Sequence, residues 1–253
     1  MTEIPLTGGN VSAGVVRVGD TVRRPAGPWT PSVHALLGHL HSVGFPGAPR
    51  PLGLDERGRE VLEFIDGDVP WPGRVDLLLP DAAVVAVGEL VRDFHDAVAG
   101  FVPPADAAWQ VLMPADGAEI VAHHDLAPWN LVAGRGRWAF IDWDTAAPGT
   151  RLWDLAYAAN GFALLPEGAG VAEAARRMRL MADAYDLTEA QRHELVDLLG
   201  PRARAMHDFL GAQSAAGTEP WRKLWDTGHG THWRRRADHL DRHRDAWLRA
   251  LLG

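Results

Sequence analysis

The chain has 253 residues, 47% of them hydrophobic, and a formal net charge of −8, which is enough apolar material for one large domain or two closely packed lobes. It contains no cysteine, so disulfides, thiolate metal sites and cysteine nucleophiles are excluded. The negative charge argues against a general nucleic-acid binder and is compatible with attraction of a cationic small molecule.

The first part of the chain is predicted to be rich in β-strands and to contain one helix. Apolar runs alternate there with turn signals such as Gly19-Asp20 and with breaks at Pro and Gly. The predicted elements are, in order, a hairpin over residues 14–19 and 21–24, a helix over 31–43, and a strand pair over 51–55 and 60–65.

A stretch rich in Pro and Gly at residues 69–73 predicts the connection between a first lobe, residues 1–66, and a second lobe, residues 67–253. Apolar residues at helical spacing dominate the second lobe. The predicted elements there are a helix from 80 to 100, a short hairpin over 131–133 and 138–141, a helix over 171–185, a helix that begins with a capping box at Thr188 and breaks or kinks at Gly200-Pro201, and a last helix over 231–252. Strands followed by helices predict an α+β fold with two lobes.

The chemistry is predicted to lie in His123-His124-Asp125-Leu126-Ala127-Pro128-Trp129-Asn130 and, after the short hairpin, in Ile141-Asp142-Trp143-Asp144. Phosphoryl transfer requires a carboxylate that deprotonates the attacking hydroxyl and oxygen ligands for Mg²⁺. Asp125 supplies the first, and Asn130 and Asp142 supply the second, because Mg²⁺ prefers hard oxygen ligands. The alternative is that Asp125 and Asn130 cap turns and Asp142 ends a strand.

The spacing H-x-D-L-x-x-x-N resembles the catalytic loop of protein kinases. Together with the Ile-Asp-Trp-Asp run and Trp153-Asp154-Leu155-Ala156-Tyr157, it makes nearly the whole chain similar to the aminoglycoside phosphotransferase family, relatives of choline kinases. The resemblance implies a bilobal protein-kinase-like fold with a small β-rich N-lobe and a larger, mainly helical C-lobe. It also implies that Asp154 supports the catalytic loop from a buried position through His123, which is expected to orient the loop rather than carry protons.

The predicted nucleotide contacts rest on weaker patterns. Residues 8–14 resemble a glycine-rich turn that places backbone amides and the Ser12 hydroxyl against phosphates, although a simple hairpin turn also explains them. By resemblance to the family hinge, the backbone of Glu63, Phe64 and Ile65 is expected to bind adenine.

The chain departs from the family at the phosphate-binding lysine of the third strand and at the glutamate of the following helix, because both are missing. Arg23 or Arg24 is the expected substitute, although arginine is a planar fork and lysine a point charge. Three outcomes are open: an active kinase with rearranged phosphate contacts, a sluggish one, or a protein that binds nucleotide without turnover. We favour the first, because a phosphate clamp can be rebuilt from other cationic donors.

The resemblance places the acceptor between the catalytic loop and the helices of the second lobe, where His124, Asp144, Asp183 and Trp221 are candidate contacts. We therefore expect a phosphotransferase that uses ATP and Mg²⁺ to phosphorylate a hydroxyl of a small molecule: an aminoglycoside or another antibiotic, or a sugar or amino alcohol. The alternative is a catalytically silent immunity or ligand-sequestering protein on the same fold.

The expected partners are a nucleotide and a small hydroxylated substrate, with no nucleic acid and no obligate protein partner. The N-terminus lacks the basic start and apolar run of a secretory signal. No segment reaches the roughly 20 apolar residues that a membrane span requires. We therefore expect a cytoplasmic protein that does not contact a membrane.

Overall fold

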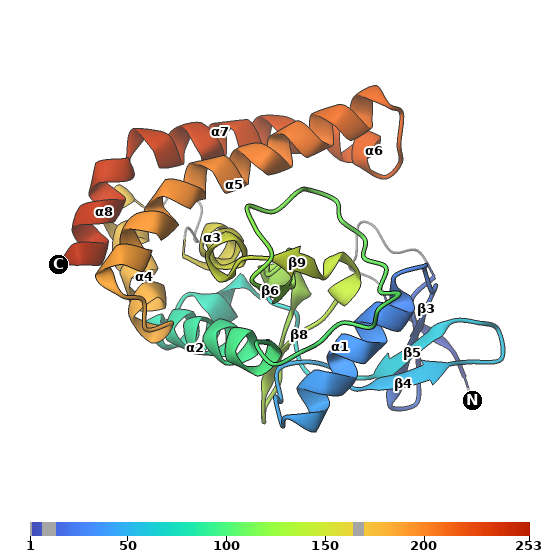
Figure 1. Ribbon diagram of the computed structural model, residues 1–253. Coiled ribbons are helices and arrows are strands. Elements are labelled where there is room, and N and C mark those ends of the chain that lie inside the picture. Colours follow the sequence, from blue (N-terminus) through green and yellow to red (C-terminus); the bar gives the residue numbers. More distant parts are fainter. Residues whose placement is uncertain (1, 7–13, 164–169) are drawn as a thin grey trace.

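The computed structural model describes residues 2–6, 14–163 and 170–253, which form a small lobe with a sheet and a larger, mainly helical lobe (Figure 1). This arrangement confirms the predicted bilobal α+β fold. The boundary between residues 66 and 67 stays a prediction. Ser12 and most of the glycine-rich stretch around it lie outside the described residues.

The small lobe is one antiparallel sheet with the strand order β1-β2-β3-β5-β4 and helix α1 beside it. The predicted hairpin, helix and second strand pair are confirmed. Their observed bounds are β1 Ile4–Pro5, β2 Val16–Val18, β3 Thr21–Arg24, α1 Thr30–Ser42, β4 Pro51–Leu54 and β5 Glu60–Glu63.

The pairing of β3 with β5 decides which arginine faces the second lobe. Arg24 lies directly opposite Glu60 in the register of these strands. Successive side chains of a strand point to opposite faces of the sheet, so Arg23 points away from the face that carries Arg24. Arg23 is accordingly within 3.8 Å of Asp55, whereas Arg24 reaches Asp142 in the other lobe.

The large lobe packs helices around two short strand pairs that carry the polar loops. The hairpin predicted after Asn130 is confirmed as β7 and β8, and the pair β6 and β9 was not predicted. The helices are α2 Asp81–Val98, α3 Arg151–Phe162, α4 Val171–Ala184, α5 Glu189–Ala215, α6 Trp221–Asp226, α7 His229–Arg242 and α8 Arg244–Leu252. The short elements are η1 Val75–Leu78, β6 Ile120–Ala122, η2 Pro128–Asn130, β7 Leu131–Ala133, β8 Trp138–Phe140, η3 Trp143–Thr145 and β9 Ala147–Gly149.

Two predicted helix ends differ from the structure. Helix α5 does not break at Pro201 but continues through it; it packs against both α3 and α7, and such packing outweighs the hydrogen bond that a proline removes. The single helix predicted over 231–252 is instead divided at His243, whose backbone leaves the helical range at φ −107° and ψ 17°. The turn lets the buried Trp247 donate its indole N–H to the Leu240 carbonyl at 2.9 Å.

One continuous hydrophobic core joins the lobes, because α1 side chains such as Leu36 and Leu40 belong to the same buried cluster as Phe94 of α2 and Trp143 beside the catalytic loop. The loop is therefore fixed against both lobes. Among the described helices, none combines the length and the apolar character needed to cross a bilayer.

The capping box predicted at the start of α5 is confirmed and allows a quantitative test. The Thr188 hydroxyl accepts from the Gln191 N–H, and the Gln191 side chain accepts from the Thr188 N–H at 3.0 Å. We expect Thr188→Ala to lower the free energy of unfolding by about 0.5–2 kcal/mol, because one backbone donor loses its partner. Urea denaturation measures this, with Thr231→Ala as an exposed control inside α7.

Candidate functional site

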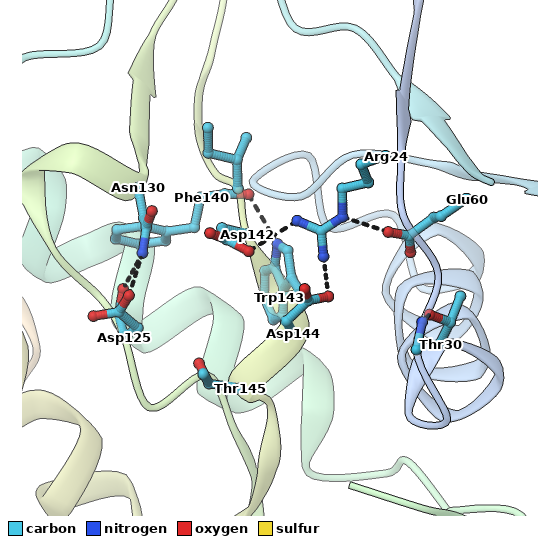
Figure 2. Close-up of polar contacts among 12 residues, drawn as sticks. Arg24, Thr30, Glu60, Asp125, Asn130, Phe140, Asp142, Trp143, Asp144 and Thr145 are labelled. Atoms are coloured by element: carbon cyan, nitrogen blue, oxygen red, sulfur yellow. Dashed lines mark hydrogen bonds and ion pairs between the residues drawn. The ribbon is translucent and has the colours of Figure 1, made fainter. Parts of the chain in front are cut away.

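The catalytic loop lies between β6 and β7 and presents Asp125 together with Asn130. The Asn130 side-chain amide donates to Asp125 Oδ2 at 2.7 Å and to the Asp125 carbonyl at 3.0 Å (Figure 2). Because the amide nitrogen is held by Asp125, the Asn130 oxygen points away from Asp125. The loop thus fixes both the carboxylate and the orientation of the amide.

Asp154, in the first turn of α3, binds the backbone of this loop through its carboxylate. Its two carboxylate oxygens accept the backbone N–H groups of His123 and His124 at 2.9 and 2.8 Å, and His95 Nε2 lies 3.3 Å away. Burial alone would raise the pKa of Asp154, but the hydrogen bond and charge of His95 and the nearby loop histidines lower it to about 2. The support expected through His123 is thus made by the His123 backbone N–H, together with that of His124.

The two histidines before Asp125 are both occupied by backbone partners. His123 is fully buried; its Nδ1 accepts from the Asp125 N–H at 3.2 Å, and its Nε2 faces the Ile141 carbonyl at 3.2 Å. This pattern requires the neutral tautomer with a proton on Nε2, and burial lowers the pKa of His123 accordingly. His124, a predicted acceptor contact, directs Nε2 to the Ala147 carbonyl at 3.1 Å instead.

Two loop residues have left-handed backbones that are uncommon for side chains other than glycine. His124 has φ 66° and Asp142 has φ 60°. Such conformations persist where the surrounding structure imposes them, and they concentrate at functional sites. Here Asp154 binds the amide of His124, and Asp142 is held by an arginine from the other lobe.

Arg24 connects the small lobe to both acidic residues of the Asp142-Trp143-Asp144 run. Its guanidinium donates to Glu60 at 2.5 Å, to Asp142 at 2.8 Å, and to Asp144 (Figure 2). The His34 ring on α1 contacts the other Glu60 oxygen at 2.9 Å. Burial opposes the charge of Glu60, yet His34 and Arg24 lower its pKa. The acidic partner missing from helix α1 is therefore supplied by strand β5.

Asp125 lies in an environment that disfavours its charge. Burial and the negative charge of Asp142 raise its pKa to about 6, against the opposing effects of Tyr157, Asn130 and Arg202. A carboxyl with a pKa close to neutrality is a better proton acceptor than an ordinary aspartate and is still ionised at pH 7. The site therefore has the electrostatics of a general base.

Two residues near Asp125, Tyr157 and Arg202, have no role predicted from the sequence. Tyr157 of α3 lies beside the Asp125 carboxylate, and the Arg202 guanidinium lies 4.2 Å from the centre of the Tyr157 ring and donates to the His124 carbonyl at 2.8 Å. Tyr157 stood in the quoted α3 motif, so the sequence contained a signal for it. Arg202 lies 77 positions after Asp125, and only the fold brings the two together.

Two backbone N–H groups of the predicted hinge are already bound within the protein. The N–H groups of Glu63 and Phe64 donate to the Arg50 and Asp20 carbonyls, both at 2.9 Å. Within the described ranges no hydrogen-bond partner is found for the Ile65 N–H. Arg17 of β2 lies over the Phe64 ring, with its guanidinium carbon 3.7 Å from the ring centre.

Two candidate acceptor contacts lie away from the catalytic loop. Asp183, near the end of α4, is paired with Arg192 of α5 at 2.7 Å and with Arg179 at 3.6 Å. Trp221 of α6 packs against Phe209 with ring centres 5.0 Å apart. The Trp221 contact is explained by helix packing, and the Asp183 contacts by surface ion pairing.

The donor atoms around Asp142 fit a divalent cation in chemical type. Asp142 uses Oδ1 for Arg24 and keeps Oδ2, and Asn130 keeps its side-chain oxygen because the amide nitrogen is bound by Asp125. A carboxylate and an amide oxygen facing one region are ligands that suit Mg²⁺, which usually retains several waters. The side chain of Asp142 is 37% exposed, so an incoming ion can reach it.

Comparisons with known proteins identify a family, a relative and structures of similar fold. The model of a family described as "Phosphotransferase enzyme family" matches residues 101–186. A relative from Rhizobium leguminosarum bv. trifolii named trifolitoxin immunity protein is 35% identical over 247 positions, which cover 89% of this chain and 92% of the relative.

Among solved structures, a choline/ethanolamine kinase family protein from Mesorhizobium loti has a TM-score of 0.65 at 17% identity and covers 94% of this chain and 89% of its own. An amicoumacin kinase bound to AMP-PNP and Ca²⁺ has a TM-score of 0.64 at 12% identity, with 90% and 86% covered. The GDP complex of aminoglycoside 2'-phosphotransferase-IIIa has a TM-score of 0.65 at 12% identity, with 95% and 93% covered. The chain therefore belongs to the phosphotransferase enzyme family, and it has the protein-kinase-like fold of choline/ethanolamine kinases and aminoglycoside phosphotransferases.

Proposed function

We propose that this protein transfers the γ-phosphoryl group of ATP, with Mg²⁺, to a hydroxyl of a small molecule. The observation that carries the proposal is the convergence of Asp125, Asn130 and Asp142 around one region, although 17 positions separate the first from the last. Asp125 and Asn130 are joined by a 2.7 Å hydrogen bond, and Asp142 is close enough to raise the pKa of Asp125. Turn capping alone gives no reason for this convergence.

Each residue has one task in the proposed reaction. Asp125 orients the acceptor hydroxyl and takes its proton as the oxygen bonds to the γ-phosphorus, while the bond from that phosphorus to the bridging oxygen breaks and ADP leaves. Asn130 and Asp142 would hold Mg²⁺, which when bound would neutralise negative charge on the phosphates. Arg24 has two N–H groups left after its three carboxylate contacts, and these are free to meet phosphate oxygens. The Ile65 N–H is the proposed hinge donor to the adenine base of ATP.

The proposed acceptor class is an antibiotic or toxin with a free hydroxyl, with sugars and amino alcohols next. The 35% identical relative is named as an immunity protein against trifolitoxin, and the structural neighbours include kinases of amicoumacin and of aminoglycosides. Chemical modification of a toxic compound would explain immunity by a phosphotransferase fold. Of the four candidate contacts, His124 and Asp144 lie in the loops around Asp125, whereas Asp183 pairs with Arg192 and Trp221 packs against Phe209.

A second candidate function is immunity by sequestration without phosphoryl transfer. It is favoured by one observation: a buried arginine occupies an oxygen of Asp142 and also binds Asp144, where a kinase of this design holds metal. In this alternative the fold binds the toxic compound, and the Asp125 carboxylate has no catalytic role.

The two candidates are separated by measuring phosphate transfer from γ-labelled ATP with Mg²⁺ to a panel of hydroxylated antibiotics, sugars and amino alcohols. We expect transfer to at least one member by the wild type and none by Asp125→Ala. Binding of a panel member, measured by calorimetry, with no labelled product for any compound would support sequestration and contradict the kinase.

A further inference from the structure

The Arg24 guanidinium is surrounded by three carboxylates, one from strand β5 and two from the Asp142-Trp143-Asp144 run. Nε donates to Glu60 of β5, one terminal nitrogen donates to Asp142 Oδ1, and the other donates to Asp144 Oδ1. Arg24 is 6% exposed and Glu60 is 1% exposed. Each nitrogen therefore has its own acidic partner in a region with little water (Figure 2).

The cluster of Arg24, Glu60, Asp142 and Asp144 has a formal net charge of −2. The three carboxylates carry three negative charges, and the Arg24 guanidinium carries one positive charge. The remaining two negative charges match one divalent cation. Phosphotransferases of the protein-kinase type instead hold two Mg²⁺ with one aspartate and one asparagine of the catalytic region.

The geometry points to Arg24 as the second cation of the phosphoryl-transfer site: its guanidinium keeps one oxygen of Asp142 and one of Asp144, and the protein takes one divalent ion with its nucleotide instead of two. The inference rests on the proposed function, because it counts the ions that accompany a bound nucleotide. One ion can use Asp142 Oδ2 and the Asn130 side-chain oxygen, which Arg24 does not touch.

Arginine is suited to this role because it stays charged. An arginine guanidinium is not deprotonated in proteins, so its positive charge stays beside Asp142 and Glu60. A second ion at Asp142 Oδ1 would have to displace the guanidinium. Displacement would leave Glu60 buried without its main counter-charge, which is strongly unfavourable.

The test counts ions by electron paramagnetic resonance of Mn²⁺, with the full-length protein and equimolar AMP-PNP. We expect one bound Mn²⁺ per nucleotide complex in the wild type and two in Arg24→Met, which frees the Asp142 oxygen. Arg23→Met is the matched control: the same substitution one residue earlier in β3, on the opposite face, where the nearest carboxylate is 3.8 Å away. It is expected to stay at one ion.

Arg24→Met leaves the buried Glu60 with only the His34 ring as a partner and can impair folding. Arg24→Met/Glu60→Gln is therefore measured beside it, with circular dichroism as the check of fold. Two ions in the wild type, or one ion in either folded Arg24 variant, would overturn the inference alone and leave the proposed function standing. AMP-PNP binding is followed separately by calorimetry. Failure of every variant to bind AMP-PNP would overturn the proposed function and the inference with it.

Discussion

Asp125→Asn is expected to lower the rate of phosphoryl transfer by about 10²–10⁴-fold, the usual contribution of a general base. Asparagine has the same size and can still accept the hydrogen bond from Asn130, which lies 2.7 Å from Asp125 Oδ2. Nucleotide affinity is expected to stay within about threefold, because the base acts in the transition state and not in nucleotide binding. Single-turnover transfer and AMP-PNP calorimetry measure the two effects.

The same variant makes a second measurement possible when no acceptor is at hand. Burial and Asp142 raise the pKa of Asp125 to about 6 in the folded, metal-free protein, above its ordinary value of 3.8. The folded state therefore holds the Asp125 proton more tightly than the unfolded state. Ionised Asp125 lowers stability above pH 6 and has no effect below pH 3.8.

Asp125→Asn should accordingly raise the free energy of unfolding by on the order of 1–3 kcal/mol at pH 7.5, and the gain should vanish near pH 4. Asp76→Asn is the control, because Asp76 is exposed and paired with Arg74 at the surface. A gain that does not depend on pH, or an equal gain in the control, would contradict this account of Asp125. Retained transfer in Asp125→Asn would contradict its role as the base.

Asp154→Ala is expected to lower the free energy of unfolding by about 3–5 kcal/mol, the typical effect of removing one partner from a buried charged network. The substitution leaves the amides of His123 and His124 and the ring of His95 without the carboxylate that now binds them. The loop should then lose its geometry, so transfer activity should fall even at temperatures where the variant is folded. Urea denaturation measures the stability.

The contribution of Asp154 should depend on pH with the opposite sign to that of Asp125. Its pKa of about 2 in the folded protein lies below the ordinary 3.8, so its stabilisation is complete above pH 4 and declines as the pH falls from 4 toward 2. Asp96→Ala removes a surface carboxylate that pairs with Arg151 at 2.6 Å and is expected to change stability by no more than about 1 kcal/mol. An effect of Asp154→Ala as small as this control would contradict the supporting role.

Local signals in the sequence were sufficient for most of the elements. Apolar periodicity and turn residues predicted the strand pairs of the small lobe, helix α2 and the hairpin after Asn130. The predictions were wrong where tertiary packing outweighs a local rule. Helix α5 continues through Pro201 because two neighbouring helices hold it, and the last helix divides at His243 to bury Trp247.

The sequence by itself determined the family and the three polar groups of the proposed reaction, because the spacing of Asp125, Asn130 and Asp142 is a local property of one loop and one hairpin. Only the tertiary structure decided which arginine faces the site and which acid partners it. Arg23 and Arg24 are adjacent in sequence, and the register of β3 against β5 places Glu60 opposite the second of them. Contacts between residues 118 and 120 positions apart, as in Arg24 with Asp142 and Asp144, depend on how the two lobes pack, and no local pattern contains that information.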